Sequence, residues 1–160
     1  MVLKPLKDAI ANGDPIRAII RNTVVNQDGK TPGITMPSCK AQTALMEDAY
    51  AQAGLDPADT HYVEAHGTGT KVGDPIEVEA MANVLSKKRG PSNPLIVGSV
   101  KANIGHLETA SGLAGLIKVI LCLEKGLIPP SINFEYENKE LLLNRRHLKV
   151  QGPNLTFYLQ

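Results

Sequence analysis

Apolar and polar residues along the chain form two kinds of stretch, which follow one another three times. Short runs of β-branched and other apolar residues predict strands at residues 16–25, 62–65 and 95–100. Longer stretches with apolar residues at helical spacing predict helices at residues 38–53, 74–89 and 108–123. A strand followed by a helix, three times over, indicates an α/β fold.

Residues at the predicted helix ends carry the signals that start and stop helices. Ser38 is expected to cap the first of these helices, and Gly54 to follow its last turn. Asp74 is expected to cap the second, with Pro75 in the first position and Glu77 completing a capping box. These signals set the boundaries that we expect for the two helices.

The helix predicted at residues 108–123 is apolar nearly all round and contains several small residues. Such a composition predicts a helix that is buried and closely packed against its neighbours. The predicted strands are also apolar throughout, so they need cover on both faces and more neighbours than these residues supply. We therefore expect an incomplete domain over residues 1–150 and an irregular tail at residues 151–160.

Composition and charge narrow the classes of function. The 160 residues include 42% hydrophobic residues, enough for a core, and the formal net charge of +1 favours neither nucleic acid nor an anionic membrane as partner. The longest apolar run, residues 113–123, is interrupted by Lys118 and too short to span a bilayer.

Cys39 and Cys122 show neither metal spacing nor a disulfide framework. We expect a reducing, cytoplasmic compartment.

Two histidines, His66 and His106, each follow a predicted strand and precede a predicted helix. In an open α/β sheet, such positions belong to the edge at which ligands bind. Lys101 lies five residues before His106, close enough to influence an imidazole or a developing anion. His61 and His147 lack this setting and are expected to be surface or structural residues.

The loop after His66 is rich in glycine and threonine. Gly67 and Gly69 remove side chains from places where a ligand could lie. The hydroxyls of Thr68 and Thr70 could hydrogen-bond the amides of an extended ligand. This loop is therefore a candidate binding segment beside the histidine.

Two imidazole N–H groups that converge on one oxygen form an oxyanion site. Such a site suits a reaction that generates an enolate, for instance loss of CO₂ from a malonyl thioester. A helix start directly after His106 would disfavour protonation of its ring and keep it a neutral donor. A metal site is the weaker alternative, because residues 61–66 hold two histidines and a glutamate without the HExxH spacing, and no metal is predicted.

Two long motifs resemble those of one family. Residues 63–77 read VEAHGTGTKVGDPIE and are similar to the first histidine motif of β-ketoacyl synthase (ketosynthase) domains. Residues 98–115 read GSVKANIGHLETASGLAG and are similar to the second. The form is that of type I polyketide synthases and animal fatty acid synthase. The match runs from about residue 5 to about residue 150 and includes the NQDG of residues 26–29 and the IPP of residues 128–130.

The resemblance implies a thiolase-like fold and decarboxylative Claisen condensation with an acyl carrier protein as partner. It implies that His66 and His106 hold the malonyl thioester carbonyl, that Lys101 supports them, and that no cofactor is bound. It also implies contacts with the substrate and its phosphopantetheine arm from Gly67, Thr68, Gly69, Thr70 and Asn103. A complete ketosynthase of this kind would be a homodimer.

The chain also departs from the family pattern. The motif of the nucleophilic cysteine, roughly Thr-Ala-Cys-Ser-Ser, is absent, and neither Cys39 nor Cys122 has its flanking residues. The closing glycine-rich strand of the family is absent as well. We therefore expect the C-terminal part of a ketosynthase, inactive in condensation by itself. The alternative is a non-catalytic remnant that binds a carrier protein or a partner ketosynthase.

Overall fold

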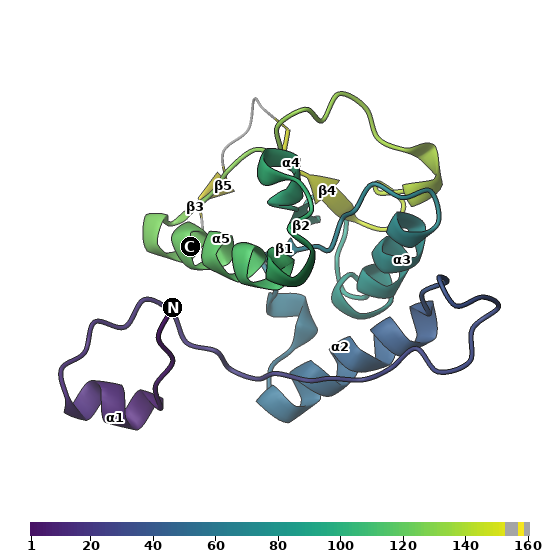
Figure 1. Ribbon diagram of the computed structural model, residues 1–160. Helices are drawn as coiled ribbons and strands as arrows, with labels where there is room; N and C mark the ends of the chain where they lie inside the picture. Colours follow the sequence, from purple (N-terminus) through teal and green to yellow (C-terminus); the bar gives the residue numbers. More distant parts are fainter. Residues whose placement is uncertain (153–156, 159–160) are drawn as a thin grey trace.

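The computed structural model describes residues 1–152 together with the backbone of residues 157 and 158. Its centre is a parallel three-stranded sheet in the order β1-β2-β4. The strands are β1 (Tyr62–Glu64), β2 (Leu95–Gly98) and β4 (Leu148–Val150). Glu64 of β1 lies opposite Gly98 of β2, so these two strands end at the same edge of the sheet. The α/β class predicted from the sequence is confirmed (Figure 1).

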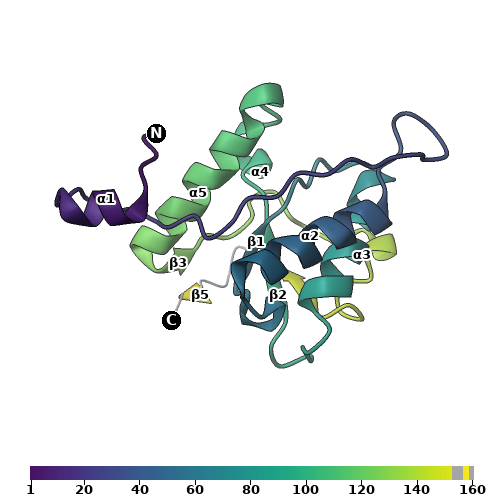
Figure 2. The same cartoon turned by 90° about the horizontal axis from the view of Figure 1, so that it is seen from below.

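Helices cover both faces of the sheet. On one side lies α3 (Gly73–Leu85), with α2 (Cys39–Ala53) packed against it, and on the other side lies α5 (Ser111–Lys125) (Figures 1 and 2). Side chains of β1 alternate between these faces: Val63 packs against the core on the α3 side, whereas Tyr62 and Glu64 contact Lys118 of α5. The face toward α5 therefore receives the polar residues of β1.

The hydrophobic core lies between α3 and the sheet. Leu95 of β2 and Leu148 of β4 are 0% and 1% exposed, which makes them the centre of this layer. The other buried residues of the cluster come from β2, from the inner face of α3, from the residue after β1 and from the segment before β4: Val97, Val78, Met81, Val84, Leu85, Ala65 and Leu143. The burial of these apolar side chains stabilises the packing of α3 against the sheet.

The predicted start and end of α2 are confirmed. The Ser38 hydroxyl accepts a hydrogen bond from the Ala41 amide at 3.1 Å. Gly54 follows the helix with a φ of 65°, in the left-handed region that glycine adopts without strain. These caps satisfy backbone groups that the helix itself leaves unpaired.

The remaining elements are short. They are α1 (Leu6–Ala11), η1 (Pro57–Asp59), α4 (Lys101–Ile104), η2 (Glu108–Ala110), β3 (Leu127–Ile128), η3 (Lys139–Leu141) and β5 (Phe157–Tyr158). The backbone of β5 pairs with β3 in antiparallel fashion, so residues 157 and 158 of the predicted irregular tail are not irregular. Residues 153–156 and 159–160 of that tail lie outside the described residues.

The strand predicted at residues 16–25 is wrong, because this segment forms neither helix nor strand. It runs beside α2 (Figure 2), where the side-chain amides of Asn22 and Asn26 donate to the carbonyls of Ala49 and Ala41 at 3.1 and 2.7 Å. β-Branched residues favour an extended backbone, but a strand also needs a neighbouring strand to pair with. The bonds to α2 run through side chains and form no ladder.

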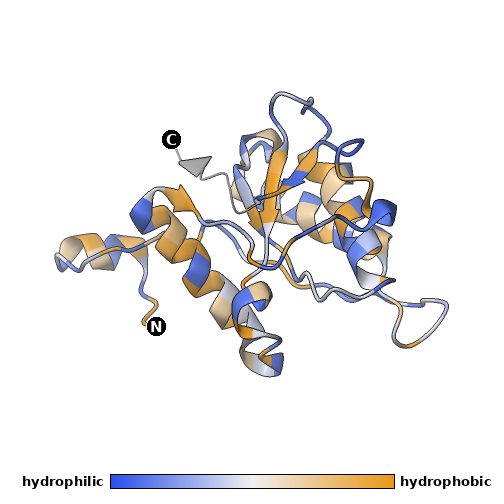
Figure 3. Cartoon of the chain, turned by 90° about the horizontal axis from the view of Figure 1, so that it is seen from above, coloured by the Kyte–Doolittle hydropathy of each residue, from blue (hydrophilic) through white to orange (hydrophobic). Residues whose placement is uncertain are grey.

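The prediction that the helix after His106 is buried all round is also wrong. Gly115 and Cys122 of α5 are buried, but an apolar row on the helix is about half exposed: Leu113 53%, Ile117 48% and Leu121 49%. Figure 3 shows the apolar residues along α5. The described chain supplies too few neighbours to cover every side of the helix. Within that part of the chain, no helix has the length and apolarity that crossing a bilayer requires.

Candidate active site

The two histidines singled out from the sequence meet. The ring centroids of His66 and His106 are 5.2 Å apart, and the ring planes are nearly perpendicular at 88°. His66 lies two residues beyond β1, and His106 lies two residues beyond α4, which begins shortly after β2. Because β1 and β2 are parallel neighbours, their ends bring both rings to one edge of the sheet. Both histidines are exposed.

The turn after His106 selects one tautomer of its ring. The backbone N–H of Glu108 donates to Nδ1 of His106 at 3.0 Å. A nitrogen that accepts a hydrogen bond carries no proton, so the proton of this neutral ring is on Nε2, which is then a donor. Glu108 reaches this position with a φ of 49°, in the left-handed region that few residues other than glycine adopt. The segment before it, where the sequence pattern predicts neither helix nor strand, contains α4.

Glu77 holds the loop that carries His66. Its carboxylate accepts from the amides of His66 and Gly67, at 2.6 and 2.9 Å. Asp74 accepts in the same way from the Gly69 amide at 3.1 Å. The predicted capping box is therefore wrong: α3 begins at Gly73, and both carboxylates bond amides of the preceding loop. Two acids near the start of α3 thus satisfy amides of the loop that carries His66.

The two threonines of the loop contact each other and the start of α3. The Thr70 hydroxyl accepts from the Gly73 amide at 3.0 Å and lies 3.4 Å from the Thr68 hydroxyl. Thr70 thus performs the capping that the sequence pattern had suggested for Asp74. Thr68 is half-buried and Thr70 is exposed.

Gly67 allows the two strand ends to approach each other. Its φ is 49°, and a Cβ at this position would lie 3.0 Å from the Cβ of Ser99, just beyond β2. The missing side chain therefore makes room for a neighbouring segment of the protein, whereas a Cβ on Gly69, with a φ of 76°, would meet open space. Of the two glycines, Gly69 is the one whose open side could admit a ligand.

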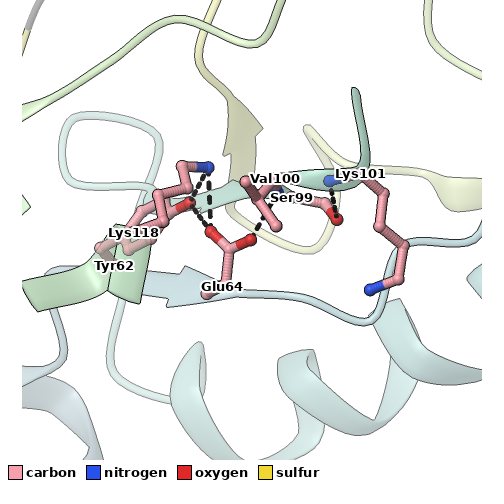
Figure 4. Close-up of polar contacts among 6 residues, drawn as sticks. All are labelled: Tyr62, Glu64, Ser99, Val100, Lys101 and Lys118. Carbon is pink, nitrogen blue, oxygen red and sulfur yellow. Dashed lines mark hydrogen bonds and ion pairs between the residues drawn. The ribbon is translucent and has the colours of Figure 1, made fainter. Parts of the chain in front are cut away.

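Lys101 and Asn103 both lie on α4, between the end of β2 and His106. The Lys101 amide donates to the Ser99 hydroxyl at 3.3 Å, and the Lys101 side chain lies to one side of the cluster of Tyr62, Glu64 and Lys118 (Figure 4). Lys101 is half-buried and Asn103 is exposed. The four residues of α4 thus carry both residues toward the edge at which the histidines meet.

The two cysteines lie on different helices, Cys39 on α2 and Cys122 on α5. Cys122 is buried in α5, and burial raises the pKa of its thiol, which favours the unreactive protonated form. The Cys39 sulfur lies 4.0 Å from the Thr43 hydroxyl on α2 and 3.8 Å from the side-chain amide of Asn83 on α3. Among the described residues, no group of three or more His, Cys, Asp or Glu side chains could hold a metal ion.

Comparison with known proteins shows the family to which the chain belongs. The family described as "Beta-ketoacyl synthase, C-terminal domain" matches residues 17–135. The chain is 60% identical over 150 residues to a highly reducing polyketide synthase of Emericella nidulans, AN6791, and 59% identical to another from Aspergillus terreus. Each alignment covers 94% of this chain and 6% of the relative.

Solved structures agree. The ketosynthase from module 6 of the bacillaene synthase from Bacillus subtilis 168 superimposes with a TM-score of 0.90 at 43% identity, over 98% of this chain and 28% of that one. An oxazolomycin ketosynthase domain of Streptomyces albus superimposes with a TM-score of 0.89 at 36% sequence identity, over 98% of this chain and 27% of that one. The fold is thus that of the thiolase-like condensing enzymes. The chain belongs to the β-ketoacyl synthase family, of which it carries the C-terminal domain in part.

Proposed function

We propose that these residues form the histidine-bearing part of a ketosynthase that joins a malonyl-type extender unit to an acyl thioester in polyketide or fatty acid synthesis. The observation that carries the proposal is the perpendicular pair of imidazoles, 5.2 Å apart at one edge of the sheet. Two N–H donors at this separation can reach a common oxygen lying between them. The family supports the same assignment.

The proposed chemistry begins with the malonyl thioester carbonyl held by both rings. The bond from the α-carbon to the carboxylate breaks, CO₂ leaves, and the electron pair moves toward the thioester oxygen to form an enolate. Nε2–H of His106 and an N–H of His66 stabilise the developing negative charge. The enolate carbon then attacks the acyl carbon of an acyl-cysteine thioester, and the thiolate departs.

Other residues of the two loops have proposed supporting roles. Lys101 would place positive charge near the enolate from α4. Residues Gly67, Thr68, Gly69, Thr70 and Asn103 would line the path of a phosphopantetheine arm borne by an acyl carrier protein. Since the Thr70 hydroxyl already accepts from Gly73, it would act toward the arm as a donor. The complete enzyme would be a cytoplasmic homodimer.

We further propose that the isolated chain does not condense acyl groups. Covalent transfer needs a thiolate, and the buried, protonated Cys122 is unsuited to that role. Both histidines are exposed, and water weakens the electrostatic interactions on which an oxyanion site depends. The cysteine and the cover over the histidines would come from ketosynthase residues beyond these 160, since the chain covers 28% of the solved ketosynthase.

The exposed apolar row on α5 favours a second candidate, a non-catalytic binding role. Other apolar residues of the same helix, Leu116, Val119 and Ile120, line an open hollow of about 1180 Å³, together with residues 1–6 and 14–22 and the end of α2. In this second candidate, the apolar side of α5 binds a carrier protein or a partner ketosynthase, and no reaction follows.

The two candidates are separated by assaying the full-length polypeptide that carries these residues with acyl and malonyl carrier protein. Condensation predicts a 3-ketoacyl product that falls on the order of 10²–10³-fold in either His66→Ala or His106→Ala. His61→Ala is the matched control, because His61 is exposed directly before β1 and outside the pair. Carrier-protein binding without product, unchanged in the histidine variants, would support the second candidate. A 3-ketoacyl product from the isolated 160 residues would refute the proposal that they are inactive alone.

A further inference from the structure

A polar cluster lies beneath the histidine loops, on the α5 face of the sheet (Figure 4). The ammonium of Lys118, from α5, lies 2.9 Å from the carboxylate of Glu64, from β1. The Lys118 and Glu64 side chains are only 15% and 10% exposed. The pair is therefore largely removed from water, where its electrostatic interaction is strong and the cost of breaking it is high.

Tyr62 closes this cluster. Its hydroxyl donates to Glu64 at 2.5 Å and accepts from the Lys118 ammonium at 2.8 Å. Burial, together with the hydrogen bond to Glu64, raises the pKa of Tyr62, so the phenol keeps its proton as a donor. The carboxylate oxygen Oε2 of Glu64 thus has two partners, one of them charged.

The other oxygen of Glu64 reaches the second histidine segment. Oε1 accepts from the Val100 amide at 2.5 Å, and Val100 is the residue directly before α4. Glu64 itself lies two residues before His66. One carboxylate therefore joins the chain segment leading to His66 with the segment leading to His106.

Two glycines leave the space that the cluster occupies. A Cβ on Gly98 would lie 2.6 Å from the Tyr62 hydroxyl oxygen, and a Cβ on Gly115 would lie 3.1 Å from Cγ of Glu64. These glycines come from β2 and α5, so both elements that pack around the β1 side chains are shaped to fit the cluster. Stability alone gives no reason for such a pair, because apolar residues of similar volume often serve equally well.

We propose that Glu64, neutralised by Lys118, is a positioning residue that sets the relative placement of His66 and His106. Its catalytic consequence rests on the proposed function, whereas its geometric consequence does not. The negative charge of Glu64 holds the Val100 amide, and Lys118 and Tyr62 hold the carboxylate in the orientation that permits this bond. Loss of either charge leaves the other buried without an opposite charge, since Tyr62 offers it only a neutral hydroxyl, and the two strand ends are then free to separate.

The test is a double-mutant cycle with Glu64→Gln, Lys118→Met and the combination of both. The glutamine retains an oxygen for the Val100 amide, so the double variant keeps that bond without any buried charge. Asp56→Asn with Lys88→Met is the matched control, because this pair has a similar separation of 2.5 Å but is exposed. Thermal melts report the folded fraction of every variant.

The first measurement uses ¹⁵N-labelled histidine in the 160-residue protein and needs no catalysis. The chain has four histidines, so His61 and His147 are internal references. We expect each single substitution to shift the ring signals of both His66 and His106, and the double variant to bring them back toward the wild-type positions. Unchanged rings in both single variants would overturn the proposal. The proposal would also be overturned if the ring signals of the double variant were shifted as far as those of the single variants.

The second measurement follows malonyl decarboxylation by the full-length polypeptide. We expect kcat of each single variant to fall on the order of tenfold at unchanged KM, and the double variant to recover most of the loss. Losses that only follow the folded fraction, or that are equal in the single and double variants, would overturn the positioning role. If the variants show the expected ring shifts but the wild-type polypeptide does not decarboxylate malonyl thioester, the proposed function is refuted. The placement of the histidines by Glu64 remains supported in that case.

Discussion

Glu108 donates its backbone N–H to Nδ1 of His106 over 3.0 Å, from a backbone conformation with a φ of 49°. The turn thereby decides which nitrogen of the ring carries the proton. An oxyanion donor needs that proton on the nitrogen that faces the substrate. The unusual backbone of Glu108 is thus tied to the chemistry proposed for its neighbour.

Replacing Glu108 tests whether the tautomer of His106 depends on the Glu108 amide. Glu108→Pro removes the N–H and forbids a positive φ, and we expect malonyl decarboxylation to fall on the order of 10²-fold, as for loss of one oxyanion donor. Glu108→Gly keeps the N–H and adopts the same φ without strain, so its kcat should stay within about twofold of wild type. A proline variant as active as the glycine variant would show that the tautomer does not depend on this bond.

Replacing Glu77 by glutamine should lower the stability of the protein. Its two oxygens accept from the amides of His66 and Gly67, and the amide of Glu77→Gln can accept only one of these bonds. We expect a loss of about 1 kcal/mol in the free energy of unfolding, the net contribution of one hydrogen bond, because the His66 amide is exposed and water can replace the lost acceptor. Denaturant melts measure it. Glu79→Gln on the same helix is the control, where an exposed contact of 3.5 Å predicts almost no change.

Gly67 should tolerate alanine less well than Gly54 does. Both have a positive φ, 49° and 65°, but only at Gly67 would the new Cβ meet another atom, Cβ of Ser99 at 3.0 Å. We expect Gly67→Ala to cost about 1 kcal/mol more than Gly54→Ala in unfolding free energy, the lower end of the range for overpacking. Adding Ser99→Gly should remove that excess. Equal costs for the two alanine variants would show that the strand ends can move apart freely.

The exposed pair of Asp56 and Lys88 makes stability depend on pH at both extremes. The hydrogen bond to Lys88 lowers the pKa of Asp56 below its ordinary 3.8, so the stabilisation is present above that pH and is lost as the pH falls through the folded value. The bond to Asp56 raises the pKa of Lys88 above 10.5, so its stabilisation is lost as the pH rises through that higher value.

Asp56→Asn should therefore be less stable than wild type in thermal melts at neutral pH. The difference should vanish in strong acid, and 1 M salt should shrink it because the pair is exposed. A difference between the two proteins that persisted into strong acid would contradict this origin.

The apolar row on α5 should make the isolated chain associate with itself. Leu113, Ile117 and Leu121 follow one another at four-residue spacing, so they share one side of the helix and are each about half exposed. We expect sedimentation velocity to show oligomers that Ile117→Lys with Leu121→Lys reduces. Lysine at Val25, which is 92% exposed in the extended segment, is the control and should leave association unchanged. A monomeric chain that unfolds cooperatively would contradict the prediction.

Local pattern was sufficient for the three long helices α2, α3 and α5, for strands β1 and β2, and for the two histidines. Periodicity of apolar residues and capping residues act over a few positions, so Ser38 and Gly54 could be assigned from the sequence. The histidines could be paired because parallel strands end at a common edge. The predicted strand at residues 16–25 failed for the opposite reason, since pairing requires a partner strand that composition does not reveal.

Contacts between distant segments needed the tertiary structure. The bond from Val100 to Glu64 spans 36 positions, and the one from Lys118 to Tyr62 spans 56. Glu77 has the spacing of a capping box, and only the path of the preceding loop shows that it bonds the amides of His66 and Gly67. Such contacts follow from strand register and helix packing, which bring together residues that share no local pattern. The sequence could therefore name the histidines, while the fold showed what holds them in place.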